Sequence, residues 1–262
     1  MNVYMGIDIG STTSKGILLS EDKKIITTYL VHAGTGTYGP MEVKKNLLAQ
    51  ANLEEEAIRY SVVTGYGRKT YEGADLQMSE LSCHAKGTHY LFPEARTVID
   101  IGGQDAKVIR IDDRGLMTDF VMNDKCAAGT GRFLEVMATV LKIDIDDMEE
   151  LAKQCEAPAK ISSTCTVFAE SEVISQLANG TTLPDLVAGI CQSVAGRISS
   201  QAKRLGVEER VCMSGGVARN GAVRSAMAKE LKTEILFSEY AQLSGAIGAA
   251  LYAMEKGKKE IA

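Results

Sequence analysis

Two of the six cysteines in this chain lie in loops of small polar residues, each directly before a predicted helix. Cys126 lies within 123–131 (NDKCAAGTG), and Cys165 lies within 162–166 (SSTCT). The amino terminus of a helix favours the thiolate, and neighbouring N–H and hydroxyl groups can donate hydrogen bonds to sulfur. These two side chains are therefore candidates to hold a metal ion or an anionic cluster.

A complete iron–sulfur or zinc site takes four ligands, whereas one chain offers only this pair. A two-fold homodimer would bring Cys126 and Cys165 of both copies to one axis and complete the set. The spacing alone leaves two alternatives open, helix-capping cysteines or a catalytic thiol. The three histidines form no recognisable metal pattern with this pair. Apolar surroundings predict that Cys83, Cys191 and Cys212 are buried, and Cys155 carries no signal.

A second pattern with chemical potential occurs twice, 92 residues apart. The segments 7–15 (IDIGSTTSK) and 99–107 (IDIGGQDAK) are identical at five of nine positions. Each predicts a tight hairpin whose N–H groups can cradle phosphate oxygens, while an aspartate at the strand end can hold Mg²⁺ through water. Lys15 could reach the phosphates as a point charge. Plain hairpins with Asp and Gly as turn residues are the alternative, and the duplication favours a nucleotide site.

Two other phosphate-binding motifs are less consistent with the chain. The Walker pattern is absent, whereas 34–39 (GTGTYG) matches the spacing of a dinucleotide-binding loop. However, this run follows the third strand of a series of hairpins and is followed by Pro40, and the acids at 54–56 do not end a second strand. A Rossmann site is therefore not favoured.

The elements that must position these residues are strands alternating with helices. Strands are expected at 3–9, 14–20, 24–31, 60–64, 96–101, 106–112, 115–121, 210–214 and 233–237. Helices are expected near 41–52, 74–91, 130–142, 167–178, 184–205, 219–231 and 242–256. The order implies an α/β architecture, and its restart near Pro93 indicates two duplicated halves. A looser pair, 63–68 and 213–219, places a glycine-rich turn between a strand and a helix in each half.

Composition narrows the classes of partner. The 262 residues are 45% hydrophobic and 24% charged with four prolines, which is typical of a globular protein. A net charge of −5 without a polybasic run argues against nucleic acid and anionic membrane. We find no leader pattern and no apolar stretch approaching about 20 residues. We therefore expect a cytoplasmic protein with reduced thiols.

Taken with these motifs, the sequence resembles the activator component of 2-hydroxyacyl-CoA dehydratases. These archerase-type ATPases belong to the family that also contains the ATPase subunits of benzoyl-CoA reductase. The likeness extends from 6–12 to 245–252, and its most specific segments are 98–105, 123–134 and 161–172.

The resemblance implies a fold of two ribonuclease-H-like domains around an ATP cleft, as in acetate and sugar kinases, Hsp70 and actin. The first domain would span 1–93 and be completed by the C-terminal helix at 241–262. The second would span 94–240 and carry both loop cysteines. It also implies a homodimer with one [4Fe-4S] cluster, held by Cys126 and Cys165 of each subunit.

The resemblance further implies site residues for ATP and Mg²⁺. The expected nucleotide contacts are Ser11, Thr12, Thr13, Ser14, Lys15, Gly102, Gly103, Gln104, Asp105, Glu135, Gly215, Gly216, Val217 and Gln242. The expected Mg²⁺-shell carboxylates are Asp8, Asp100 and Asp105. Gln104 suits a role in orienting water, as glutamine does in other NTPases, and Asp8 and Asp105 are the other candidate catalytic residues.

By the same resemblance, reduced ferredoxin or flavodoxin would charge the cluster. ATP hydrolysis would then drive one low-potential electron to the dehydratase, in an oxygen-sensitive protein of amino-acid fermentation. Two alternatives share the fold, a small-molecule kinase and an ATP-dependent binding module like Hsp70 or actin. A kinase could use Asp105 as its base, but Gln104 and the paired cysteines would then lack a purpose. A related reductase is the alternative partner for such an activator.

Overall fold

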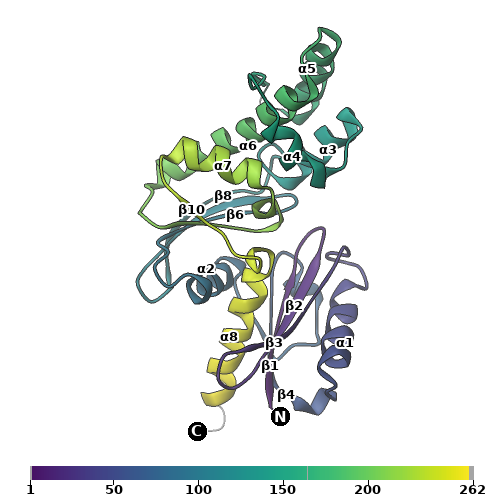
Figure 1. Ribbon diagram of the computed structural model, residues 1–262. Coiled ribbons are helices and arrows are strands. Elements are labelled where there is room, and N and C mark those ends of the chain that lie inside the picture. Colours follow the sequence, from purple (N-terminus) through teal and green to yellow (C-terminus); the bar gives the residue numbers. More distant parts are fainter. Residues whose placement is uncertain (1, 164, 260–262) are drawn as a thin grey trace. The chain divides into compact units, whose positions relative to one another are not determined.

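The computed structural model describes residues 2–163 and 165–259, which form two α/β units. The first unit consists of Met1–Glu94, Ile111–Thr118 and Gln242–Ala262, and the second consists of Ala95–Arg110 and Asp119–Ala241. Each unit has its own five-stranded sheet (Figure 1).

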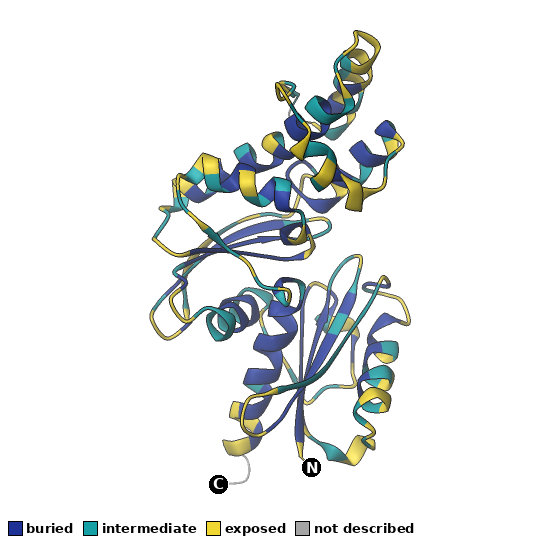
Figure 2. Cartoon of the chain, viewed as in Figure 1, coloured by how far each residue is buried: buried dark blue, intermediate teal, exposed yellow. Residues whose placement is uncertain are grey.

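The first sheet has the strand order β3-β2-β1-β4-β5. Its strands are β1 (Val3–Ile9), β2 (Ser14–Leu19), β3 (Ile25–Val31), β4 (Ile58–Thr64) and β5 (Leu76–Gln77). The first three strands form antiparallel hairpins, and β4 runs parallel to β1. The strand β1 reads as a nearly continuous apolar run because both of its faces are buried (Figure 2).

Helices cover both faces of this sheet, as Figure 1 shows. The helices are α1 (Gly39–Ala51), α2 (Glu80–Leu91) and α8 (Ser244–Lys259). Val43 and Leu47 of α1 pack into one core with the odd-numbered residues of β1, while α8 packs against α2 and the central strands. Short 3₁₀ turns lie at Glu55–Ala57, Arg68–Thr70 and Ala241–Leu243. The turn between β1 and β2 therefore lies at one end of a sheet that helices cover on both faces.

The second sheet repeats this plan with the order β10-β9-β6-β7-β8. Its strands are β6 (Thr97–Ile101), β7 (Ala106–Ile111), β8 (Met117–Asn123), β9 (Val211–Ser214) and β10 (Ile235–Leu236). The helices are α3 (Gly131–Leu141), α4 (Met148–Lys153), α5 (Thr166–Ala178), α6 (Leu183–Leu205) and α7 (Gly221–Leu231). Further 3₁₀ turns lie at Ile145–Asp147 and Gly216–Arg219. Side chains of β6, α3, α6 and α7 form the core of this unit.

The two units match each other down to single residues. The series β1-β2-β3-α1-β4 corresponds to β6-β7-β8-α3-β9. After the fourth strand of each series comes a glycine with positive φ, Gly65 at +89° and Gly215 at +84°. A Cβ at these positions would lie 2.5 Å from the oxygen of Ile9 and 2.3 Å from that of Ile101, so both need glycine. This equivalence supports the internal duplication.

The structure differs from the predicted elements in a few places. The helix expected at 74–91 begins only at Glu80, because the two-residue strand β5 pairs with β4 before it. The strand expected at 115–121 begins at Met117, since Gly115 has a φ of +74° and belongs to the turn. The six-residue helix α4 was not expected. Elements this short contain too few residues to show a period.

Candidate nucleotide and cluster site

The first hairpin places a buried carboxylate beside a lysine. Asp8 of β1 is 2% exposed, and its Oδ2 accepts a hydrogen bond from Lys15 Nζ at 3.1 Å. The same Oδ2 lies 3.9 Å from Nε2 of His84 in α2. Its Oδ1 is buried without a hydrogen-bond partner among the described residues. A buried acceptor without a donor is costly, so this oxygen fits a water molecule of a hydrated Mg²⁺.

In the second hairpin, both oxygens of the buried Asp100 carboxylate have hydrogen-bond partners. Asp100 Oδ1 accepts a hydrogen bond from Ser214 Oγ at 2.7 Å, and its Oδ2 accepts one from Lys107 Nζ at 3.3 Å. The Lys107 ammonium also lies 2.7 Å from Asp105 Oδ2. The side chain of Asp105 is 28% exposed, whereas those of Asp100 and Lys107 are each 2% exposed. Asp105 is thus the accessible carboxylate of this hairpin.

The predicted phosphate contacts of the first hairpin do not all face outward. Ser11, Thr12 and Thr13 form the turn and are partly or fully exposed. Ser14 instead is buried, and its hydroxyl donates a 2.6 Å hydrogen bond to the carbonyl of Ala33. The turn backbone and the first three hydroxyls therefore remain as donors for a phosphate.

The remaining predicted nucleotide residues are spread over several elements. In the second unit, Gln104 is exposed at the hairpin tip, and Gly215, Gly216 and Val217 turn the chain from β9 into a 3₁₀ helix. Glu135 lies on α3 and pairs with Arg132 at 3.2 Å. Gln242 lies in the 3₁₀ turn before α8.

The second hairpin is hydrogen-bonded directly to the start of α3, the helix that follows the Cys126 loop. The N–H of Gly131 donates to the carbonyl of Gly102 at 2.9 Å, and the N–H of Arg132 donates to that of Gly103 at 2.8 Å. A displacement of the hairpin backbone would therefore pull on the helix end next to Cys126.

The loop that carries Cys126 is held by its own side chains. Asn123 Nδ2 donates to the carbonyl of Cys126 at 2.9 Å, and Asn123 Oδ1 accepts from the Cys126 N–H at 3.3 Å. Thr130 Oγ1 donates to the carbonyl of Ala127 at 2.6 Å. The backbone is thus fixed while the Cys126 side chain is exposed.

Cys165 lies at the N-cap position of α5 and is also exposed. The loop before it is bound by Glu172 of the same helix. The Glu172 carboxylate accepts hydrogen bonds from the N–H and Oγ of Ser162 at 2.9 and 2.8 Å and from the N–H of Ser163 at 2.8 Å. Burial raises the pKa of Glu172, but these hydrogen bonds outweigh it and lower the pKa to about 2.

One guanidinium connects the two cysteine loops. Arg197 of α6 donates from Nη2 to the carbonyl of Ser163 at 2.7 Å, in the Cys165 loop. Its aliphatic part packs against Gly129 of the Cys126 loop, 3.7 Å from where a Cβ would lie. Burial lowers the pKa of Arg197, and the charges of Cys126 and Cys165 raise it. Arg197 is thus one cation that contacts the loops of both cysteines.

Among the described residues, Cys126 and Cys165 are the exposed cysteines. Within residues 2–163 and 165–259, no three His, Cys, Asp or Glu side chains are grouped closely enough for a metal ion. Cys83, Cys191 and Cys212 are buried, as predicted, and burial raises the pKa of the Cys83 and Cys191 thiols to about 12. Burial and a hydrogen bond to Asp185 raise the pKa of Cys155 to about 11. The raised pKa values favour the protonated thiols of Cys83, Cys155 and Cys191, and Cys212 is buried, whereas both loop cysteines are exposed.

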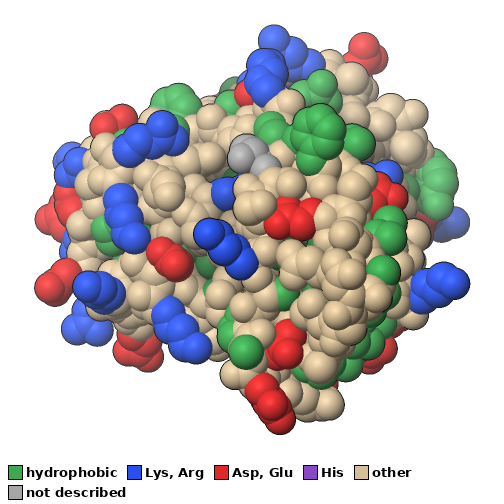
Figure 3. Space-filling model, turned by 90° about the horizontal axis from the view of Figure 1, so that it is seen from above, with side chains coloured by type: hydrophobic (Ala, Val, Ile, Leu, Met, Phe, Trp, Pro, Cys, Tyr) green, Lys and Arg blue, Asp and Glu red, His purple; other side chains and the backbone are tan. Residues whose placement is uncertain are grey.

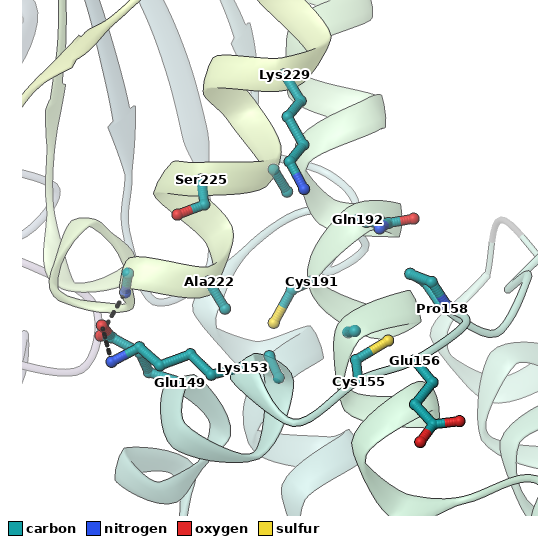
Figure 4. A pocket seen from close by; sticks show the side chains of 14 residues that line it. Glu149, Lys153, Cys155, Glu156, Pro158, Cys191, Gln192, Ala222, Ser225 and Lys229 are labelled. Atoms are coloured by element: carbon teal, nitrogen blue, oxygen red, sulfur yellow. Dashed lines mark hydrogen bonds and ion pairs between the residues drawn. The ribbon is translucent and has the colours of Figure 1, made fainter.

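A pocket of about 400 Å³ lies elsewhere in the second unit, between α4, α6 and α7 (Figure 4). Its charged lining residues are Glu149, Lys153, Glu156 and Lys229. Glu149 also accepts a 2.8 Å hydrogen bond from the N–H of Gly221 and pairs with Lys153 at 3.2 Å. None of the predicted site residues lines this pocket.

The surface view in Figure 3 shows Lys and Arg side chains interspersed with Asp, Glu and hydrophobic side chains. Among the described hydrophobic side chains, α5 exposes Val167 (66%), Phe168 (69%), Ile174 (50%) and Leu177 (42%). A helix that exposes this many large apolar side chains is typical of an interaction surface. The described helices include none that is both long and apolar enough to span a bilayer.

Several residues of the site were not found from sequence. Lys107 could have been, because it aligns with Lys15 in the duplicated segment. Glu172 and Arg197 carry no comparable signal, since their contacts depend on how α5 and α6 pack on the loops.

The structure resembles solved proteins over almost its full length. It superposes on the activator of the 2-hydroxyisocaproyl-CoA dehydratase from Clostridium difficile with bound ADPNP at a TM-score of 0.96 and 51% identity, covering 99% of this chain and 97% of that one. A ROK family glucokinase from Streptomyces griseus, in complex with glucose and AMPPNP, is 13% identical and matches at a TM-score of 0.59, over 97% of this chain and 100% of that one. The predicted fold class is thereby confirmed.

Sequence comparison agrees with the structural likeness. The chain is 52% identical over 261 residues to the (R)-2-hydroxyglutaryl-CoA dehydratase activating ATPase of Acidaminococcus fermentans, covering 99% of this chain and 100% of that protein. Residues 5–253 match the profile of one family along nearly the whole chain. The chain belongs to the BadF/BadG/BcrA/BcrD ATPase family.

Proposed function

We propose that this protein is the ATP-hydrolysing activator of a 2-hydroxyacyl-CoA dehydratase and delivers one low-potential electron to it. The observation that carries the proposal is the pair of hydrogen bonds between the Gly102–Gly103 hairpin and the start of α3. They tie a phosphate-type loop to the helix that follows Cys126. Relatives at about half identity are named as a dehydratase activating ATPase and as an activator of a 2-hydroxyacyl-CoA dehydratase.

Phosphate contacts are assigned to each of the two hairpins. In this proposal the backbone and hydroxyls of Ser11, Thr12 and Thr13 and the loop at Gln104 donate to phosphate oxygens. Asp8 would serve hydrated Mg²⁺, because one of its oxygens has no hydrogen-bond partner among the described residues, and Asp105 would do so as the accessible carboxylate of its hairpin. Gln104 orients the attacking water, and the turn at Gly215 contacts the adenosine side.

The redox group is assigned to the two loop cysteines. Cys126 and Cys165 of two copies would hold one [4Fe-4S] cluster, since a single chain offers two of the four thiolates. When bound, such a cluster stores and releases one electron. The exposed apolar side chains of α5, which begins directly after Cys165, support a contact between copies there. We assign reduced ferredoxin or flavodoxin as donor and the dehydratase as acceptor.

Energy considerations explain why ATP is used. Moving one electron through 100 mV takes about 2.3 kcal/mol. A shift of a few hundred millivolts therefore needs on the order of 5 to 10 kcal/mol, which exceeds the typical coupling of about 1 to 3 kcal/mol between two binding sites. Nucleotide hydrolysis must then be linked to the transfer, and the Gly102–Gly131 and Gly103–Arg132 hydrogen bonds offer a direct mechanical link.

Anaerobic purification followed by iron and sulfide analysis tests the proposal. We expect a brown protein with about four iron atoms for every two chains. The variants Cys126→Ala and Cys165→Ala should each lose the colour. The matched control Cys155→Ala should keep it, because Cys155 lies outside both loops. A colourless protein, or iron retained in both loop variants, would contradict the proposal.

A further inference from the structure

Arg197 is a charged side chain that the proposed chemistry does not use directly, although it contacts both cysteine loops. It lies in the middle of α6, a helix whose buried face is otherwise made of small and apolar side chains. It is half-buried in the second unit. A cation that is partly removed from water needs compensating contacts. The contacts of Arg197 should therefore explain why a charged residue occupies this position.

The contacts of Arg197 divide between the loops. Its Nη2 donates to the Ser163 carbonyl at 2.7 Å, two residues before Cys165. Its stem packs against Gly129, three residues after Cys126, where φ is +87° and a side chain would be strained. Its guanidinium also lies 5.9 Å from the ring centroid of Phe133, which is fully buried in α3. Arg197 thus contacts α3 and both cysteine loops.

The electrostatic role follows from the same placement. Two thiolates that approach one cofactor repel each other and add negative charge to it. A fixed cation that contacts both cysteine loops offsets this charge, and arginine keeps its charge throughout the working pH range. Net charge and hydrogen bonding around an iron–sulfur cluster set its reduction potential.

We propose that Arg197 is a positioning residue that holds the Cys126 and Cys165 loops together, and that its charge makes the bound cluster easier to reduce. This inference rests on the proposed function for its redox part only. The positioning part concerns the chain itself and can be tested without iron.

Three substitutions separate the two roles. Arg197→Ala removes both the hydrogen bond and the charge. Arg197→Gln removes the charge but retains a donor, and Arg197→Lys retains the charge but loses the planar fork of donors. Arg204→Ala is the matched control, because Arg204 is an exposed arginine near the end of the same helix.

Hydrogen exchange of the iron-free protein is the first measurement. Arg197→Ala, which also removes the stem that packs against Gly129, should accelerate exchange in peptides covering 123–131 and in peptides covering 162–163, whereas Arg204→Ala should leave both at parental rates. Acceleration in neither segment, or in only one, would overturn the positioning role. This result does not depend on the cluster, so it also separates a failure of the present inference from a failure of the proposed function.

The reduction potential of the iron-loaded protein is the second measurement. Arg197→Gln should shift the potential to a more negative value, because the reduced cluster loses a neighbouring cation, while Arg197→Lys should stay near the parent. Arg197→Ala should retain less iron than either. A potential unchanged in Arg197→Gln would overturn the charge role. If the parent binds no iron, the proposed function and the charge role both fail, and hydrogen exchange alone decides the positioning role.

Discussion

The two phosphate-type hairpins share a backbone but differ in how their buried aspartates are satisfied. Ser214 donates to Asp100 at 2.7 Å, whereas the equivalent Thr64 donates its hydroxyl to the carbonyl of Met78 at 3.1 Å. Asp8 Oδ1 consequently has no donor among the described residues. Both oxygens of Asp100 therefore have hydrogen-bond donors, whereas Asp8 has one oxygen without a donor among the described residues, and this difference supports the proposal that Asp8 serves Mg²⁺.

Replacing the lysine of each hairpin should give the largest effect. The loss of unfolding free energy should differ between the two hairpins. Lys107→Met leaves Asp100 and Asp105 buried or half-buried without their shared cation, which should lower the free energy of unfolding by about 3 to 5 kcal/mol. Lys15→Met should cost less, because Lys15 neutralises only Asp8. Denaturant unfolding of both variants measures the difference. Equal and small losses would contradict the assignment of a structural role to the second hairpin.

Replacing individual aspartates should lower the rate of ATP hydrolysis to a different extent in the two hairpins. Asp8→Asn removes the negative charge next to the proposed Mg²⁺ and should lower the rate of ATP hydrolysis about 100-fold, equivalent to about 2.7 kcal/mol. Asp105→Asn should also lower the rate. Asp100→Asn should lower the rate of hydrolysis less than Asp8→Asn does. It should mainly lower the free energy of unfolding, since the Asp100 oxygens accept hydrogen bonds from Ser214 and Lys107. Steady-state ATPase assays, with unfolding measured in parallel, check the ordering, and a greater loss of hydrolysis in Asp100→Asn than in Asp8→Asn would reverse it.

The hydroxyl groups of Ser214 and Thr64 allow the same comparison with smaller expected effects. Ser214→Ala leaves Asp100 Oδ1 without its donor and should cost about 1 to 3 kcal/mol of stability. Thr64→Val affects a carbonyl of the chain and not Asp8, so it should leave nucleotide affinity unchanged. Thermal unfolding and binding of a non-hydrolysable ATP analogue measure the two effects. A loss of analogue affinity in Thr64→Val would show that the hairpins are more alike than their contacts suggest.

A pH-dependent effect concerns the cysteine loops. The folded pKa of Glu172 is lowered to about 2 from 4.5, so its contribution to stability is complete above the unfolded value and is lost as pH falls from about 4.5 toward 2. Parent and Glu172→Gln should therefore differ in unfolding free energy at pH 7 and converge near pH 2. Glu170→Gln, on the same helix but outside the Ser162 and Ser163 contacts, is the control. A constant difference across this range would exclude the linkage.

The smallest expected effect is on the nucleotide response. Glu135 is accessible, and its carboxylate pairs with Arg132 at 3.2 Å. Glu135→Ala should weaken the change that ATP causes in the cluster while iron content stays at the parental value. Visible spectra recorded with and without ATP measure this. Loss of iron with unchanged ATP affinity would instead place Glu135 in the support of the cysteine loop.

The sequence predicted what depends on local pattern. The duplicated 7–15 and 99–107 segments predicted both hairpins, and the small polar loops before helices singled out Cys126 and Cys165, which are the exposed cysteines. It did not predict the arrangement behind them, because the bond from Arg197 to Ser163 joins residues 34 positions apart through the packing of α6. The same limit applies to Ser214 and Asp100, which are 114 positions apart.

Native mass spectrometry of protein kept free of oxygen tests the central claim most directly. The account predicts a species with the mass of two chains plus one Fe₄S₄ unit, which divides into iron-free single chains when Cys126 or Cys165 is replaced. A single chain that carries its own cluster, or a dimer that contains no iron and persists in the cysteine variants, would contradict it.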